Sequence, residues 1–257
     1  MSTATTVRRF LATRHSLRVE AASVLLLYVV YEATRGLIAG SRRVAVEHAQ
    51  AVASLERGLH VFVEPNVQHA AHAVPGLMAV LGAAYLTLHL SVTAALLLWL
   101  HQRRPDAYAR IRTTLFIASA IALAVFVSFP TAPPRLAAVG LADTVSSRHI
   151  DLNKGLISAL YNPFAAVPSL HIGYAVVVGA TLARHARTRL LRVAGAAYPP
   201  LVLLVIVATG NHFLFDAAAG MLVVAVSYLL ALTVLQPRAA RPGSRLPGAG
   251  RRAAPAM

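Results

Sequence analysis

Long runs of apolar residues, separated by shorter polar segments, dominate the pattern along the chain. A helix needs about 20 residues to cross the hydrocarbon core of a bilayer, and six runs come near that length. The pattern therefore predicts an all-α fold, a polytopic membrane helix bundle with six transmembrane helices. The fourth run is the shortest and is expected to extend into its flanking sequence. The six runs cover residues 19–40, 74–100, 113–129, 168–182, 193–209 and 212–235.

The polar segments divide the chain into three parts. Residues 1–18 form an N-terminal arm, residues 19–235 form one membrane domain, and residues 236–257 form a tail. Repeated Pro, Gly, Ala and Arg predict that the tail is disordered. The first run is interpreted as a span and not as a signal peptide, because it is too long and because Glu32 and Arg35 interrupt it.

Two long connectors join the runs, and both are expected on the same side of the membrane. The connector at residues 41–73 contains an amphipathic stretch, residues 44–60, of the kind that lies in a membrane interface. The connector at residues 130–167 is rich in Pro, Gly and polar residues. It is long for a connection without a function of its own.

Composition agrees with a membrane protein and excludes several other classes. Hydrophobic residues make up 57% of the 257 residues and charged residues only 13%, whereas soluble domains carry about 25% charged residues. The chain has no cysteine, which excludes disulfides and cysteine-based zinc sites. The net charge of +15 does not indicate nucleic-acid binding, because the basic residues are dispersed between apolar runs.

The basic residues instead indicate orientation. Seventeen arginines fall in the N-terminal arm, the second and fourth connectors and the tail, whereas six basic residues fall in the connectors on the other side. Cytoplasmic loops carry the positive excess in membrane proteins. Both termini are therefore predicted to be cytoplasmic, and the two long connectors are predicted to face outward.

Three polar clusters lie at the predicted outer ends of spans, and the third contains His212 and Asp216. Residues four apart share one face of a helix. A carboxylate that accepts a hydrogen bond from one imidazole nitrogen fixes the tautomer and leaves the other nitrogen as a base or nucleophile. An acidic residue inside an apolar run is costly and usually functional. The alternative is a satisfied polar pair inside the bundle.

The first and second clusters add groups suited to an anion. Pro168 fits the first helical position, so the backbone N–H groups of Ser169 and the residues after it would form an anion site at a helix start. His171 could donate a proton to a leaving oxygen, or it could be an interfacial histidine without a role. Asn211 predicts a second helix N-terminus on the same side. Arg135 could clamp a phosphate in bidentate fashion, or it could be an interfacial anchor.

Zinc is the competing chemistry, since His171, His212 and Asp216 are a possible ligand set. Arginine and helix N-termini beside them favour an anion over a cation. Other polar residues stay open. Arg35 either neutralises Glu32 or reaches the phosphate pocket, and His89 either pairs with Tyr85 or lines the cavity; for Glu32 and Tyr85 the structural interpretation is favoured. Glu56 and Glu64 are expected to be solvated or to fix the outer connector.

The three clusters resemble the motifs of the type 2 phosphatidic acid phosphatase superfamily, and most closely those of its inositol phosphorylceramide synthase-like branch. The segment that ends in Pro-Ser-Leu-His at His171 resembles the second motif. Thr-Gly-Asn-His, ending at His212 and followed by Asp216 and Gly220, resembles the third motif, and Pro-Pro-Arg at Arg135 resembles the first. The resemblance runs from the first span to about residue 235.

The resemblance implies a role for each residue. His212 would attack phosphorus and form a phosphohistidine, Asp216 would orient it, and His171 would protonate the leaving group. Arg135 and backbone amides, with Ser169 and Asn211, would hold the phosphate, and no metal or other cofactor would be used.

Three positions depart from the phosphatase pattern. Ser128 and Ile206 stand where that pattern has a lysine and an arginine, and Leu170 replaces a glycine. The synthase-like branch shares these departures, and Arg35 is the candidate to supply a missing charge.

The function implied is that of a membrane lipid-phosphate phosphatase or phosphotransferase. The substrate would be a lipid phosphate, phosphodiester or pyrophosphate, and a polyol such as inositol could be the acceptor. The resemblance further implies a bacterial plasma membrane, and the arginine count predicts that the active site lies at its extracytoplasmic face. The alternative is a catalytically silent membrane protein that binds or moves lipid head groups. Intact His171, His212 and Asp216 argue against that alternative, because binding alone does not require an oriented nucleophile.

The predicted topology can be tested by cysteine labelling, because the native chain has no cysteine. Single cysteines at Ser146, in the second outer connector, and at Ser244, in the tail, should react from opposite sides of the membrane. The measurement is labelling of intact cells with a membrane-impermeant thiol reagent. Labelling of both positions from outside would contradict the arrangement of six spans.

Overall fold

A computed structural model of the chain describes residues 16–37, 40–143 and 162–236. The described part consists of helices and the loops that connect them, with one isolated bridge between Thr131 and Ala165. The predictions for the N-terminal arm before residue 16 and for the tail after residue 236 lie outside the described residues. The helices are α2 (Leu17–Leu37), α3 (Arg42–Gly58), α4 (Glu64–His72), α5 (Leu77–Arg103), α6 (Pro105–Ser128), the 3-10 turn η1 (Pro134–Leu136), α8 (Leu170–His185), α9 (Arg189–Ala208) and α10 (Leu214–Leu235).

Four of the described helices, α5, α6, α9 and α10, are long and apolar enough to cross a membrane. They correspond to the second, third, fifth and sixth predicted spans, and they indicate an integral membrane protein. The prediction of six spans is thus confirmed only in part. The helix α8 has 16 residues, a length of roughly 24 Å at 1.5 Å per residue. The helix α2 has 21 residues but carries charged side chains near both ends, among them Glu20 and Arg35.

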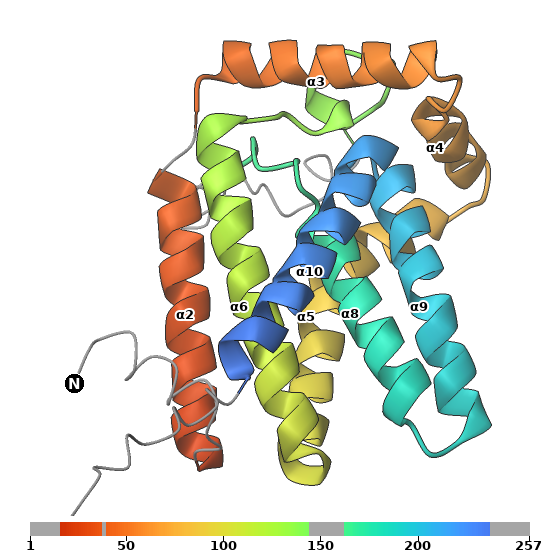
Figure 1. Cartoon of the computed structure of the whole chain (residues 1–257). Helices are drawn as coiled ribbons and strands as arrows, with labels where there is room; N and C mark the ends of the chain where they lie inside the picture. The colour runs from red at the N-terminus through yellow and green to blue at the C-terminus, as the bar shows by residue number, and fades with distance from the viewer. Residues whose placement is uncertain (1–15, 38–39, 144–161, 237–257) are drawn as a thin grey trace, which may run out of the picture.

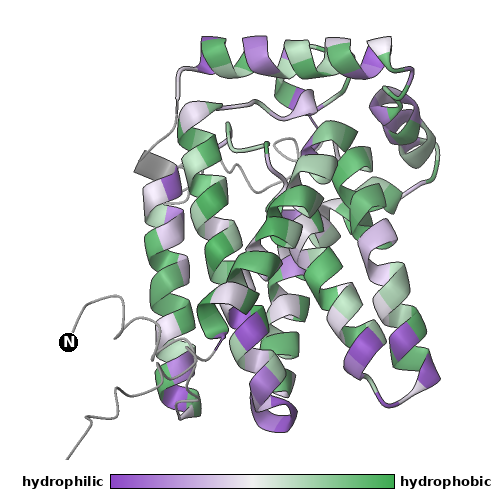
Figure 2. Ribbon diagram, viewed as in Figure 1, coloured by the Kyte–Doolittle hydropathy of each residue, from purple (hydrophilic) through white to green (hydrophobic). Residues whose placement is uncertain are grey.

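The helix α3 lies across one end of the bundle, over the ends of the long helices (Figure 1). The turns between α5 and α6 and between α8 and α9 lie at the opposite end, where hydrophilic residues gather (Figure 2). The arginines of the second and fourth connectors therefore share one end of the molecule, as the charge count predicts. The amphipathic stretch expected at residues 44–60 is α3, which buries Ala45, Ala49, Val52, Ala53 and Glu56 against the rest of the chain.

One arginine was assigned to the wrong environment by that charge count. Arg112 lies inside α6 and is fully buried, with its Nη1 donating to Glu20 Oε1 of α2 at 2.6 Å. Tyr108 adds a hydrogen bond to the same carboxylate at 2.8 Å. Removing one partner from such a buried pair leaves the other charge buried without compensation, which destabilises the fold. The pair therefore fixes α2 against α6 near the arginine-rich end.

The helices α8 and α10 cross at close range where both carry glycine. A Cβ atom added at Gly220 of α10 would collide with the carbonyl oxygen of Ser169, and one added at Gly173 of α8 would lie 3.1 Å from the carbonyl oxygen of Gly220. Only glycine lets the two backbones approach in this way. This contact sets the start of α8 against the start of α10, and both starts carry candidate site residues.

Both of these helices begin two residues later than predicted. Ser169 is the N-cap residue of α8, so Pro168 precedes the cap and does not occupy the first helical position. Phe213 is the N-cap residue of α10, so His212 lies in the loop before the helix. The apolar pattern marks the extent of each run, but the point at which a helix begins depends on which side chain caps it.

The glycine contact gives a direct test by substitution. Gly220→Ala should lower the thermal stability of the purified protein by about 1–3 kcal/mol, because the added methyl group forces apart a tightly packed crossing. Gly82→Ala in α5 is the matched control, since a Cβ there meets nothing within 4 Å. The measurement is thermal unfolding in detergent; equal midpoints for the two variants would contradict the packing described here.

Candidate functional site

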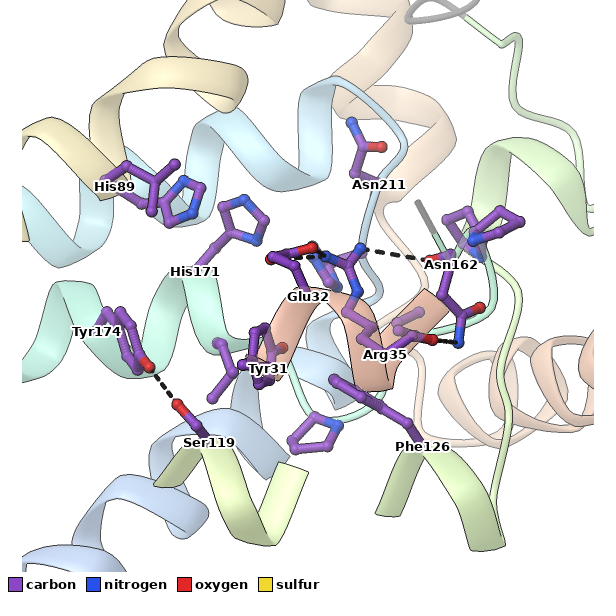
Figure 3. A pocket seen from close by; sticks show the side chains of 18 of the residues that line it. Tyr31, Glu32, Arg35, His89, Ser119, Phe126, Asn162, His171, Tyr174 and Asn211 are labelled. Carbon is purple, nitrogen blue, oxygen red and sulfur yellow. Dashed lines mark hydrogen bonds and ion pairs between the residues drawn. The ribbon is translucent and has the colours of Figure 1, made fainter. Parts of the chain in front are cut away.

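A polar cavity of about 110 Å³ lies among α2, α5, α6 and α8, near the end of the bundle covered by α3. His171 and His212 line it together with His89 and Arg35. Figure 3 shows side chains from these helices and from two loops around the same space. The chain thus brings residues from α2 near its N-terminus to residues of the 209–213 loop near its C-terminus.

His171 is packed between aromatic rings within the cavity. The ring centroid of Tyr85 lies 4.5 Å from that of His171, and the two rings are nearly parallel. The centroid of His89 lies 4.1 Å away and that of His212 lies 5.4 Å away. Of the two possibilities considered for Tyr85 and His89, the structure places both side chains in the cavity lining. Tyr85 was expected to have only a structural role, but its ring also lines the cavity and packs on His171.

Asp216 orients His212 by accepting a hydrogen bond from Nδ1 at 3.2 Å. The same carboxylate oxygen accepts the backbone N–H of Phe213 at 3.0 Å. The pairing was predicted, but its explanation as two residues on one helical face is wrong. His212 precedes the helix, and Asp216 reaches it because a carboxylate in the first turn folds back to cap the helix. The imidazole Nε2 is left for other partners.

The start of α8 is tied to the start of α10 by the backbone. The N–H of Ser169 donates to the carbonyl oxygen of Asp216 at 3.0 Å, and the Ser169 side chain is fully buried. The prediction that the Ser169 N–H serves an anion is therefore wrong, because that donor is already occupied. Its actual effect is positional, since the bond holds His171, two residues further on, across from His212.

The start of α10 does not offer its first backbone N–H groups to an anion. Its first backbone donors are taken by carboxylates of the chain itself: the N–H of Leu214 by Glu64 Oε1 at 2.9 Å and the N–H of Phe215 by Glu56 Oε1 at 2.6 Å. Both glutamates are buried, with 0% and 2% exposure, so they are not solvated. They fix the outer connector, which was the other expectation for them.

Arg135, which was considered as a phosphate clamp, bonds to Asn211. Arg135 Nε donates to Asn211 Oδ1 at 2.9 Å, and Nη1 pairs with Asp143 at 3.0 Å. The backbone N–H of Arg135 also donates to the carbonyl oxygen of Gly210 at 3.0 Å. Asn211 lines the cavity, whereas neither Arg135 nor Ser169 is among the described lining residues. Arg135 thus joins the first cluster to the third.

Arg35 is the lining residue that brings a full positive charge into the described part of the cavity. Its Nη1 lies 3.0 Å from Glu32 Oε2, so the neutralising pair considered from the sequence does form. Its Nη2 also donates to the carbonyl oxygen of Asn162 at 3.3 Å, and the Asn162 side chain returns a bond to the Arg35 carbonyl oxygen at 2.9 Å. Both possibilities for Arg35 therefore hold together: it pairs with Glu32 and it lines the cavity (Figure 3).

Sequence reasoning missed the hydroxyl groups of the cavity wall. Tyr31 of α2, Ser119 of α6 and Tyr174 of α8 all line it, and the hydroxyl oxygens of Ser119 and Tyr174 are 2.6 Å apart. Tyr174 lies three residues after His171, a helical spacing that would place both on one face. That spacing was the available signal for Tyr174; Tyr31 and Ser119 had none, because their runs carry no motif.

His171, His212 and Asp216, the residues considered as zinc ligands, all lie in the described ranges. Within the described ranges, no three His, Cys, Asp or Glu side chains are grouped so that they could hold a metal ion. Asp216 instead bonds to His212 and to the backbone of Phe213.

Comparison with known proteins identifies one family. The family model described as the PAP2 superfamily matches residues 50–230. No curated protein and no solved structure gives a significant match. The match contains Tyr85, His89, His171, His212 and Asp216, whereas Arg35 and the rest of α2 precede it.

The cavity geometry predicts that Arg35, and not an arginine on the surface, sets its affinity for anions. Arg35→Gln should weaken binding of orthovanadate roughly tenfold to hundredfold, because a hydrogen bond to a charged group contributes about 1.5–3 kcal/mol. Arg43→Gln is the control, since the Arg43 side chain is 83% exposed. Calorimetric titration of the purified protein measures both affinities. Equal losses in the two variants would mean that the anion binds elsewhere.

Proposed function

The chain belongs to the PAP2 superfamily, and from that premise we propose that it is a lipid-phosphate phosphatase or phosphotransferase with His212 as nucleophile. Members of the superfamily are generally phosphatases or phosphotransferases that act on phosphate esters in a membrane environment. The observation that carries the proposal is the pair of histidines across one cavity, 5.4 Å apart between ring centroids, of which His212 is oriented by Asp216.

The proposed first step forms a bond between His212 Nε2 and phosphorus. The bond between phosphorus and the lipid oxygen breaks, and His171 gives its proton to that oxygen as it leaves. Asp216 accepts from Nδ1, so it stabilises the imidazole as positive charge develops. In the second step water or an alcohol attacks the phosphohistidine, gives its proton to His171 and restores His212. No metal or cofactor takes part in this scheme.

Arg35 is the proposed phosphate-binding cation. It already lies in the cavity, and its partner Glu32 holds the guanidinium toward the space between α2 and α8. Asn211 is the proposed polar contact from the third motif. Ser169 and Arg135 are proposed to act indirectly. The backbone bond of Ser169 holds the segment that carries His171, and the side-chain bond of Arg135 holds Asn211.

A second space supports a lipid as the substrate. A largely apolar groove of about 530 Å³ runs between α2, α5 and α6. It shares Tyr28, Tyr31, Leu90, Ser119 and Tyr174 with the cavity, so the two spaces adjoin at these side chains. A phosphate ester whose head group lies beside the histidines would have room for an apolar chain in this groove, where burial contributes about 0.8 kcal/mol per methylene.

The proposed membrane arrangement keeps the six spans, with α2 and α8 crossing together with the four longer helices. It also keeps both termini in the cytoplasm and the cavity at the extracytoplasmic face of a bacterial plasma membrane. The end that carries α3 would face outward, because the arginine-rich connectors lie at the other end. An acceptor alcohol such as inositol would then reach the phosphohistidine from outside, and water would do so in a hydrolase.

The two histidines can be separated by the leaving group. A lipid alkoxide needs a proton to leave, whereas a nitrophenolate needs little help. His171→Ala should therefore lose far more activity on a lipid phosphate than on the corresponding nitrophenyl ester, by roughly 10²–10⁴-fold. His212→Ala should lose both activities about equally. The measurement is steady-state turnover by purified protein with each substrate.

His69→Ala is the matched control, since His69 is an exposed histidine of α4 outside the cavity. It should turn over both substrates like the unmodified protein. If His171→Ala and His212→Ala both retain full activity, the histidines are structural and the proposal fails. If the unmodified protein turns over no phosphate ester of a lipid, with or without polyol acceptors, the chain is not this enzyme.

A further inference from the structure

We propose that Glu56 and Glu64 are positioning residues for the His212–Asp216 pair, holding the first turn of α10 through two carboxyl groups that share one proton. Their importance for turnover rests on the function proposed for that pair. Their effect on the stability of α10 does not rest on that function, so the effect on turnover and the effect on the helix can be tested separately.

The first observation is the bonding at the start of α10. The N–H of Leu214 donates to Glu64 Oε1 at 2.9 Å, and the N–H of Phe215 donates to Glu56 Oε1 at 2.6 Å. The N–H of Phe213 donates to Asp216 Oδ2 at 3.0 Å. Three successive backbone donors therefore each meet a carboxylate, and these come from α4, α3 and α10 itself. Two of the three carboxylates are about 150 residues away in the chain.

The second observation is where this turn lies. Asp216 Oδ2, which caps Phe213, is the oxygen that accepts from His212 Nδ1. The carbonyl oxygen of Asp216 accepts from the N–H of Ser169 at the start of α8. A shift of the turn would therefore move both His212 and the segment that carries His171. Neither Glu56 nor Glu64 is among the described residues that line the cavity, so they act through the turn.

The third observation concerns the remaining carboxyl oxygens. Glu56 Oε2 and Glu64 Oε2 are both buried, and neither has a hydrogen-bond donor among the described residues. Glu56 interacts with Glu64 through a side-chain hydrogen bond and through charge, and a hydrogen bond between two carboxyl groups requires a proton on one of them. Two buried carboxylates side by side repel strongly, and one of them then keeps its proton to a higher pH. One shared proton satisfies both oxygens.

The charges around the pair agree with a single proton. The pKa of Glu56 is raised to about 8, with burial as the largest cause. The hydrogen bond and charge of Glu64 also raise this pKa, and the Phe215 N–H lowers it. Asp216 faces Glu56 from α10 and adds negative charge. Arg57, the next residue in α3, lies over the ring of Phe62, with Cζ 4.5 Å from its centroid. The helix N-terminus stabilises one net negative charge, and the proton removes the other.

The shared proton predicts how stability depends on pH. The pKa of Glu56 is raised on folding from its usual value of 4.5 to about 8. Its contribution to stability is therefore fully present below 4.5 and is lost as pH rises through 8. Above that pH two charges lie together, and the first turn of α10 is expected to loosen. Turnover should fall with it, in kcat more than in KM, because the nucleophile is displaced and the lipid groove is not.

The experiment uses the full-length protein in detergent with Glu56→Gln, Glu64→Gln and Glu56→Ala. Glutamine keeps a carbonyl acceptor for the backbone N–H and its amide can donate to the partner carboxylate, whereas alanine does neither. Glu47→Gln is the matched control, because Glu47 is an exposed glutamate of the same helix. Thermal unfolding and amide hydrogen exchange at Phe213, Leu214 and Phe215 are measured from pH 5 to pH 9.5, and kcat and KM over the same range.

The expected result is a clear order of variants. Glu56→Ala should speed exchange of the Phe215 amide on the order of tenfold or more, since a buried backbone bond is lost. Glu56→Gln should restore slow exchange and should flatten the fall in stability between pH 7 and pH 9. Glu64→Gln should likewise keep exchange of the Leu214 amide slow and flatten the fall in stability. Where turnover is measurable, alanine should lower kcat and glutamine should restore most of it without the alkaline fall.

Three results would overturn the proposal. One is a Glu56→Gln variant that loses stability with rising pH just as the unmodified protein does. Another is a Glu56→Gln variant as impaired as Glu56→Ala. The third is a Glu56→Ala variant that binds the substrate more weakly, as a higher KM, with kcat unchanged. If no substrate is turned over, the function proposed for His212 fails, but exchange and stability still decide whether the two glutamates hold the turn.

Discussion

The site depends on one contact, between the chain that enters α8 and the first turn of α10. The N–H of Ser169 donates to the carbonyl oxygen of Asp216 at 3.0 Å, over a glycine at position 220 that leaves no room for a side chain. His171 follows Ser169 by two residues, and His212 precedes Asp216 by four. A single backbone bond therefore fixes the separation of the two histidines, and the motif that contains Gly220 is as much a packing requirement as a chemical one.

Around this contact carboxylates cap the start of α10, and the cavity contains the ion pair of Arg35 with Glu32. Carboxylates of α3, α4 and α10 take the backbone donors at the start of α10, on the side away from the cavity. The guanidinium of Arg35 enters the cavity from α2, on the side of the histidines. In a water-poor interior each group is worth more than it would be in solvent. The arrangement gives His212, the proposed nucleophile, a rigid support and supplies one cationic group to the cavity for the proposed phosphate.

Much of this could be predicted from the sequence, and the exceptions share a cause. The apolar runs locate the four long helices, and the motif spacing correctly pairs His212 with Asp216. The start of α10 was misplaced because the cap at Phe213 depends on a carboxylate that folds back. Glu56 was expected in solvent or in the loop, since nothing near it in sequence reveals a helix start 159 residues away. Local sequence likewise does not record that Arg135, the expected phosphate clamp, bonds to Asn211 and Asp143. Each of these is a tertiary contact that local pattern does not encode.

The central claim is that His212 carries the phosphoryl group, and trapping the intermediate tests it most directly. The purified protein would be mixed with a radiolabelled lipid phosphate, quenched within one turnover in denaturant at high pH, digested and mapped. A phosphoramidate is stable in base and labile in acid, so the account predicts a base-stable, acid-labile label on the peptide that contains His212. A label on His171 or on a carboxylate would contradict this role of His212, and so would turnover without any labelled residue.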